Sequence, residues 1–180
     1  MEPLAPQAVE RRAFVELRVK ARSLEGYAAT FGSEAKFGSF SEVIEPGAFR
    51  AALASDVLAL MDHDPGKVLG RTGSGTLRLS EDSRGLAFAL DLPDTQAGQD
   101  VRALAERGDL GGMSFGFTVA SGGDEWRGTK RILRTIDLRE ISVVSAFPAY
   151  PDTSLALRSA AHAGAHASRR RRIMLAEYGL

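Results

Sequence analysis

Residues 111–117, "GGMSFGF", place one serine among glycines and bulky apolar residues. The alternation continues through "MSFGFTV" (113–119) and predicts a β-strand. Successive strand side chains point to opposite faces, so the bulky residues would share one face and Ser114 the other, beside glycines. The stretch predicts either a nucleophile that a substrate can approach closely or a serine whose neighbouring glycines admit a packed segment.

The sequence around this strand predicts a domain built mainly from β-strands. Strands are expected in "AFVELRVKA" (13–21), "LEGYAATF" (24–31), "DVLALMDHD" (56–64) and "RILRTIDLREISVVS" (131–145), with a hairpin formed by "TLRL" (76–79) and "LAFALDL" (86–92). Helices are expected in "EPGAFRAALASD" (45–56) and in "DTQAGQDVRALAERGD" (94–109), the second capped by Asp94 or Thr95 and ended by Gly108. Many strands with few helices predict the α+β class, as a mostly antiparallel β-barrel or closed sheet flanked by helices.

Shifts in composition divide the chain into three parts. Residues 1–12 are expected to form a flexible arm, and residues 13–158 the folded domain. Residues 159–180 are rich in alanine and contain four consecutive arginines, which predicts a flexible basic tail.

Composition narrows the classes of function. The chain has 180 residues with 23 basic and 23 acidic side chains, so no net charge favours specific nucleic-acid binding. It has no cysteine, which excludes disulfides, a thiol nucleophile and thiolate metal sites. No apolar run approaches the ~20 residues of a membrane span, and the first residues lack the apolar core of a signal peptide. We therefore expect a soluble intracellular protein with no cofactor and no bound metal.

His63 is the one histidine outside the predicted tail, and it follows an apolar strand. It is either an ordinary surface residue between Asp62 and Asp64 or a general base, the frequent role of imidazole near neutral pH.

Glu140 is the carboxylate that most needs a partner. On strict alternation it shares a mainly apolar face with Ile136 and Leu138, whereas Asp137 lies among polar neighbours. A buried carboxylate must be paired or lose its charge. Glu140 could orient His63, which in turn would deprotonate Ser114. The alternative, a salt bridge to one of the many arginines, stays open on these grounds.

The order of these residues, with their local sequences, resembles the prohead (procapsid maturation) protease family of tailed phages. The resemblance runs from about Glu16 to Arg158. It is carried by "EVIEPGAF", "MDHDPGKVLGRTGSGTLRL", "GLAFALDLPDT", "RGDLGGMSFGF" and "LREISVVSAFPAYPDTSLALR". It implies a serine endopeptidase distantly related to the herpesvirus assembly protease and a similar barrel. By motif position it implies that His63 is the base and Ser114 the nucleophile. Glu140 is added as the acid because its strand face is expected to be buried.

The resemblance also implies a role in capsid maturation. Family members act in the host cytoplasm inside the immature procapsid, on the scaffolding part of the major capsid protein and usually on themselves. It leaves homo-oligomerisation open. Two other interpretations remain: an inactive capsid assembly or scaffold module with the same barrel, and an unrelated β-barrel binding module. Oxyanion-hole donors could come from "PAYP" (148–151) or from the backbone near Arg71.

Overall fold

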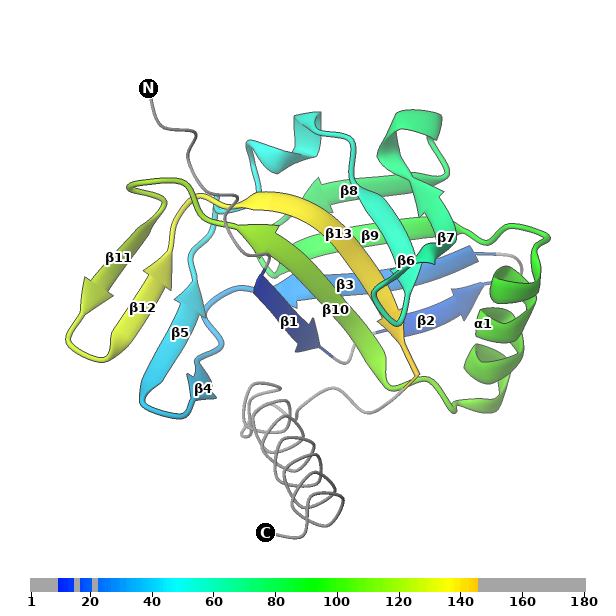
Figure 1. Ribbon diagram of the computed structural model, residues 1–180, viewed down its shortest axis with the longest axis horizontal. Helices are drawn as coiled ribbons and strands as arrows, with labels where there is room; N and C mark the ends of the chain where they lie inside the picture. The colour runs from blue at the N-terminus through cyan, green and yellow to red at the C-terminus, as the bar shows by residue number, and fades with distance from the viewer. Residues whose placement is uncertain (1–9, 15–16, 21–22, 146–180) are drawn as a thin grey trace, which may run out of the picture.

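The computed structural model describes residues 10–14, 17–20 and 23–145, whose strands form three sheets (Figure 1). The first sheet has five strands in the order β1 (Glu10–Phe14), β10 (Gly112–Thr118), β13 (Asp137–Val144), β6 (Leu58–Met61) and β7 (Asp64–Arg71). All neighbours in it pair antiparallel except β13 and β6, which are parallel.

The two other sheets have four strands each. One has the order β2 (Leu17–Lys20), β3 (Ser23–Thr30), β9 (Gly85–Asp91) and β8 (Leu77–Glu81). The other has the order β11 (Asp124–Arg127), β12 (Lys130–Leu133), β5 (Phe40–Ile44) and β4 (Ala35–Phe37). Figure 1 shows the first sheet lying across the second, with the third at one end and α1 (Gln96–Arg107) at the other.

The predicted α+β class is confirmed, but the described strands form no closed barrel. The segment predicted as one strand over 13–21 contributes to two sheets, because β1 pairs with β10 and β2 pairs with β3. The likeness to the herpesvirus protease fold stays a prediction.

The predicted strand over 131–145 is wrong as a single element. It divides into β12 and β13, which lie in different sheets. The backbone N–H groups of Arg134 and Thr135 both donate to the carbonyl oxygen of Gly123, and that of Ile136 donates to Ala48. These contacts with other segments turn the chain where its own residues carry no turn signal.

The two helix predictions have different outcomes. The helix over 96–107 is confirmed: Thr95 Oγ1 accepts from the N–H of Gly98 at 3.3 Å, and Gly108 ends the helix at φ 74°. The predicted helix over 45–56 is wrong, since this segment forms turns and a short 3₁₀ helix, η1 (Ala52–Ala54). Tertiary contacts replace helical ones there, because the N–H of Phe49 donates to a carboxylate oxygen of Glu81.

The predicted hairpin over 76–92 is confirmed by the pairing of β8 with β9. The Asp82 carboxylate closes its turn by accepting from the N–H groups of Arg84 and Gly85. This is the local capping that short polar side chains provide in turns.

The hydrophobic core fixes which face of β10 is left for polar groups. Met113, Phe115 and Phe117 of β10 join the main core cluster, as do Ile141 and Val143 of β13. Ser114 and its two neighbouring glycines therefore lie on the opposite face, as their alternation predicts.

None of the helices in the described ranges is long and apolar enough to cross a membrane. Glu10–Arg12 of the predicted arm belong to β1. The rest of that arm and the whole predicted tail lie outside the described residues, so the domain boundaries stay predictions.

Candidate active site

Ser114 lies in the middle of β10, between β1 and β13. Its backbone is opposite Ala13 on one side and Ser142 on the other. The side chain is fully buried, and its hydroxyl donates to the carbonyl oxygen of Arg12 in β1 at 2.6 Å. The residue that the sequence singles out is therefore at present bonded to a neighbouring strand.

Glu140 reaches the Ser114 face through a β-bulge. Phe117 is opposite Leu138 and Gly116 is opposite Glu140, so Arg139 is an extra residue in β13. The bulge puts Leu138 on the core face and Glu140 on the Ser114 face, because opposed residues of paired strands share a face. The expectation that Leu138 and Glu140 share a face is thus wrong, although Glu140 is buried as expected.

Glu140 contacts His63 and Ser142 through different carboxylate oxygens. Its Oε1 lies 2.6 Å from Nδ1 of His63, and its Oε2 accepts from the Ser142 hydroxyl at 2.5 Å. The side chain of Glu140 is 8% exposed and that of His63 is 18% exposed. A carboxylate at Nδ1 favours the tautomer whose proton is on Nδ1, which leaves Nε2 as an acceptor.

Gly116 makes room for this carboxylate. A Cβ atom added at residue 116 would lie 2.6 Å from Oε1 of Glu140 and 3.0 Å from its Cγ. The glycine beside the serine thus admits a packed neighbour, and that neighbour is the carboxylate of Glu140. This contact agrees with the second explanation of the glycine-rich stretch, in which a glycine admits a packed neighbour.

A strained turn presents His63. Asp62 and His63 connect β6 to β7 with φ values of 52° and 59°. Non-glycine residues in this left-handed region cost about 1–3 kcal/mol each, and such residues gather at functional sites. Asp62 anchors the turn to the end of β13: its N–H donates to Val143, and its carboxylate accepts from the N–H and hydroxyl of Ser145.

The structure brings two of the three predicted site residues into direct contact. His63 and Glu140 are bonded, and Ser114 lies on the same face through its register with Ser142. Among the described residues, the Ser114 hydroxyl donates to Arg12 and not to His63. Asp137, which the alternation places among polar neighbours, is exposed and opposite Thr118.

The sequence interpretation did not include Ser142 or Arg12. Ser142 was detectable, because it lies two positions from Glu140 on the same alternation. Arg12 had no comparable signal, since its place beside Ser114 depends on the register between β1 and β10.

A network of charged side chains joins β1 to the third sheet. Arg12 makes two bonds to Glu42, from Nε at 2.6 Å and from Nη2 at 2.8 Å. Arg131 binds both oxygens of Glu10 and also contacts Glu42 at 3.2 Å and Asp124 at 2.7 Å. Burial alone would raise the pKa of Glu10, but the hydrogen bonds and charges of Arg131 and Arg12 outweigh it and lower that pKa. Burial opposes the charge of Arg131, yet Glu10 and Asp124 raise its pKa above the usual value.

The candidate oxyanion donors near Arg71 are already engaged. The N–H of Arg71 donates to Thr76 Oγ1, that of Thr72 to the carbonyl of Val57, and that of Gly73 to Asp56. Residues 148–151, the other candidate, lie outside the described residues.

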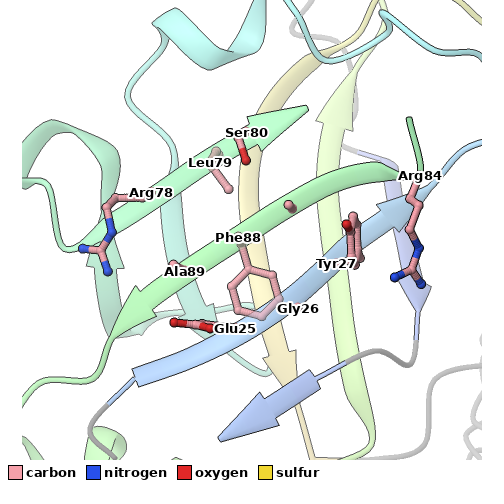
Figure 2. A pocket seen from close by; sticks show the side chains of 10 residues that line it. Glu25, Gly26, Tyr27, Arg78, Leu79, Ser80, Arg84, Phe88 and Ala89 are labelled. Carbon is pink, nitrogen blue, oxygen red and sulfur yellow. The ribbon is translucent and has the colours of Figure 1, made fainter. Parts of the chain in front are cut away.

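A separate hollow of about 470 Å³ lies on the second sheet (Figure 2). It is lined by Glu25, Gly26, Tyr27, Arg78, Leu79, Ser80, Arg84, Ala87, Phe88 and Ala89. These residues belong to β3, β8, β9 and the β8–β9 turn, and include none of the predicted site residues. The hollow is therefore distinct from the Ser114 face of the first sheet.

Comparison with known proteins places the chain beside phage proteases. The family described as caudovirus prohead serine protease matches residues 9–167. The prohead protease of Enterobacteria phage HK97 is 33% identical over 163 residues, which cover 84% of this chain and 69% of that protein. No solved structure matches the chain.

Proposed function

The chain belongs to the caudovirus prohead serine protease family and is a serine protease of capsid maturation, and we propose that Ser114, His63 and Glu140 are its catalytic residues. The contact of 2.6 Å between His63 and Glu140, on the face of the sheet that carries Ser114, supports this assignment most directly.

The proposed mechanism is acyl transfer through Ser114. Its Oγ attacks the scissile carbonyl carbon while Nε2 of His63 accepts the hydroxyl proton. Glu140, bonded at Nδ1, stabilises the imidazolium that forms. The imidazolium then gives its proton to the leaving amine, which departs as the C–N bond breaks. Water, deprotonated by His63, attacks the acyl-enzyme, and the imidazolium returns that proton to Oγ of Ser114 as the C–Oγ bond breaks.

The proposed substrate is the scaffolding part of the major capsid protein, cut within the immature procapsid in the host cytoplasm. Family membership supports this class of substrate.

We include the protease itself as a second substrate, with a cut between residues 158 and 172, in and just before the predicted tail. Intact masses of the wild-type protein and of Ser114→Ala, prepared identically, test this second substrate. Equal tail lengths would contradict self-cleavage.

An inactive assembly module with the same fold is the competing function, because the Ser114 hydroxyl is buried and engaged by Arg12. Labelling with a serine-reactive fluorophosphonate separates the two functions. A protease incorporates the probe at Ser114 and loses the label in Ser114→Ala. A folded protein that stays unlabelled at Ser114, even when a substitution in β1 weakens the pairing of β1 with β10, would instead support the inactive module.

A further inference from the structure

Strand β1 occupies the edge of β10 at the proposed nucleophile. It is the end strand of its sheet and pairs with β10 from Glu10 opposite Phe117 to Phe14 opposite Met113 (Figure 1). Within this pairing the Ser114 hydroxyl donates to the main-chain carbonyl oxygen of Arg12 at 2.6 Å. A substrate must approach Ser114 closely, so β1 has to leave before the serine can react.

The departure of β1 would expose a strand edge suited to an extended peptide. The N–H and C=O groups of β10 that now pair with β1 would lack partners, and an extended chain can satisfy them by adding as a new strand. A substrate strand that took this place would have a carbonyl beside Ser114, where the Arg12 carbonyl lies now.

The side chain of Arg12 fills a slot built for a guanidinium group. Two bonds from Arg12 reach the carboxylate of Glu42, whose side chain is 2% exposed. The guanidinium carbon of Arg12 lies 4.3 Å from the ring centre of Phe37 and 5.2 Å from that of Phe117. A planar guanidinium can make a paired contact with a carboxylate and stack on aromatic rings at once, which an ammonium group does less well.

The Glu42 carboxylate would still favour a cationic side chain in this slot if Arg12 were removed. Glu42 retains a contact of 3.2 Å to Arg131, but Arg131 also serves Glu10 and Asp124. The side of the Glu42 carboxylate that Arg12 now occupies would be left buried and without its paired donor. Because a buried charge without its partner is costly, an incoming cationic side chain is favoured.

We propose that β1 is an internal occupant of the substrate-binding edge, and that Glu42 with Phe37 selects substrates with an arginine side chain at the position of Arg12. This inference rests on the proposed function, because it takes Ser114 as the nucleophile. In the present bond the Ser114 hydroxyl donates its proton to the Arg12 carbonyl oxygen and not to His63. The bound strand is therefore held in a resting arrangement.

The first arm of the test measures access to Ser114. We compare the rate of fluorophosphonate labelling in the full chain, in Arg12→Gln, and in Arg78→Gln as a control. Arg78 forms an exposed pair with Asp91 on the second sheet. Labelling should be at least about tenfold faster in Arg12→Gln and unchanged in Arg78→Gln. If Arg12→Gln does not fold by circular dichroism, Arg12→Lys replaces it, since lysine keeps the charge but not the paired contact.

The second arm measures selectivity for arginine. The peptide AVERRAFVE, residues 8–16, competes with labelling of the Arg12-substituted protein, as does the same peptide with citrulline, a neutral isostere, at position 12. The arginine peptide should protect Ser114 at a concentration at least about tenfold lower. Adding Glu42→Gln to the substituted protein should remove this difference. The comparison of the two peptides on the Arg12-substituted protein is decisive by itself. It therefore still holds if the double variant with Glu42→Gln does not fold.

The outcomes separate this inference from the proposed function. Equal labelling rates in the wild-type protein and the loosened variant overturn the role of β1. Equal protection by the two peptides overturns the role of Glu42. Both of these results leave Ser114 as the nucleophile. A folded, loosened variant that never labels at Ser114 overturns the proposed function as well.

Discussion

Nδ1 of His63 lies 2.6 Å from Oε1 of Glu140, although 77 positions separate the two residues in the sequence. Three local features produce this contact. The left-handed turn at Asp62 and His63 carries the imidazole to the end of β6, the bulge at Arg139 turns the carboxylate to the same face, and Gly116 leaves space for it.

Replacing Glu140 by glutamine should lower kcat strongly and stability little. The amide keeps the shape of the side chain but cannot stabilise the imidazolium or hold the productive tautomer, and the same change in a Ser-His-Asp triad lowers kcat by about 10⁴-fold. Asp137→Asn is the matched control, because Asp137 lies on the same strand and is exposed. Peptide or capsid-protein cleavage gives kcat, and urea unfolding gives stability. A larger effect at Asp137 than at Glu140 would show that another acid orients the histidine.

Adding one methyl group at Gly116 should disturb the site more than it disturbs the fold. The new Cβ would lie 2.6 Å from Oε1 of Glu140, so the carboxylate must move away from His63. Overpacking of this kind costs about 1–3 kcal/mol of stability. Gly66→Ala is the control, because its nearest contact is the exposed carboxylate of Asp64 at 3.2 Å. Thermal unfolding and kcat/KM are measured for both variants. Full activity in Gly116→Ala would mean that Glu140 does not need its present position.

Acid should weaken the attachment of β1 through Glu10. The Glu10 pKa is lowered in the folded protein by Arg131 and Arg12, against the opposing effect of burial. Its stabilising contribution is therefore complete above the unfolded pKa of about 4.3 and is lost as the pH falls through the lower folded value. The free energy of unfolding of wild-type protein should exceed that of Glu10→Gln near neutral pH, and the gap should close in acid. Urea unfolding across pH measures this gap, and a gap that widened in acid would contradict the assigned pairing.

The sequence predicted the local elements better than it predicted their assembly. The strand around Ser114, the hairpin over 76–92 and the helix over 96–107 follow from alternation, turn residues and caps. The division of 131–145 into two strands does not, because it depends on the hydrogen bonds of Arg134 and Thr135 to Gly123, at the open end of the β11–β12 hairpin, and of Ile136 to Ala48.

For the candidate site, too, the sequence identified residues but not how the strands bring them together. Residue type and spacing singled out Ser114, His63 and Glu140, and the resemblance to the family supported two of them. Strict alternation placed Glu140 beside Leu138, because a bulge leaves no signature in the single sequence. The roles of Ser142 and Arg12 depend on strand register, which the sequence alone did not specify.

The central claim is that Ser114 is the nucleophile. The most direct test compares cleavage of the capsid protein by the wild-type protein and by Ser114→Ala. Wild-type protein and Ser114→Ala are each co-expressed with the major capsid protein proposed as the substrate, and the capsid protein is sized by intact mass. Loss of one hydroxyl and its bond to Arg12 should cost about 1 kcal/mol and leave the protein folded, which circular dichroism checks. The wild-type protein should shorten the capsid protein, and Ser114→Ala should leave it at full length. Shortening by Ser114→Ala at the wild-type rate would contradict the assignment of Ser114 as the nucleophile.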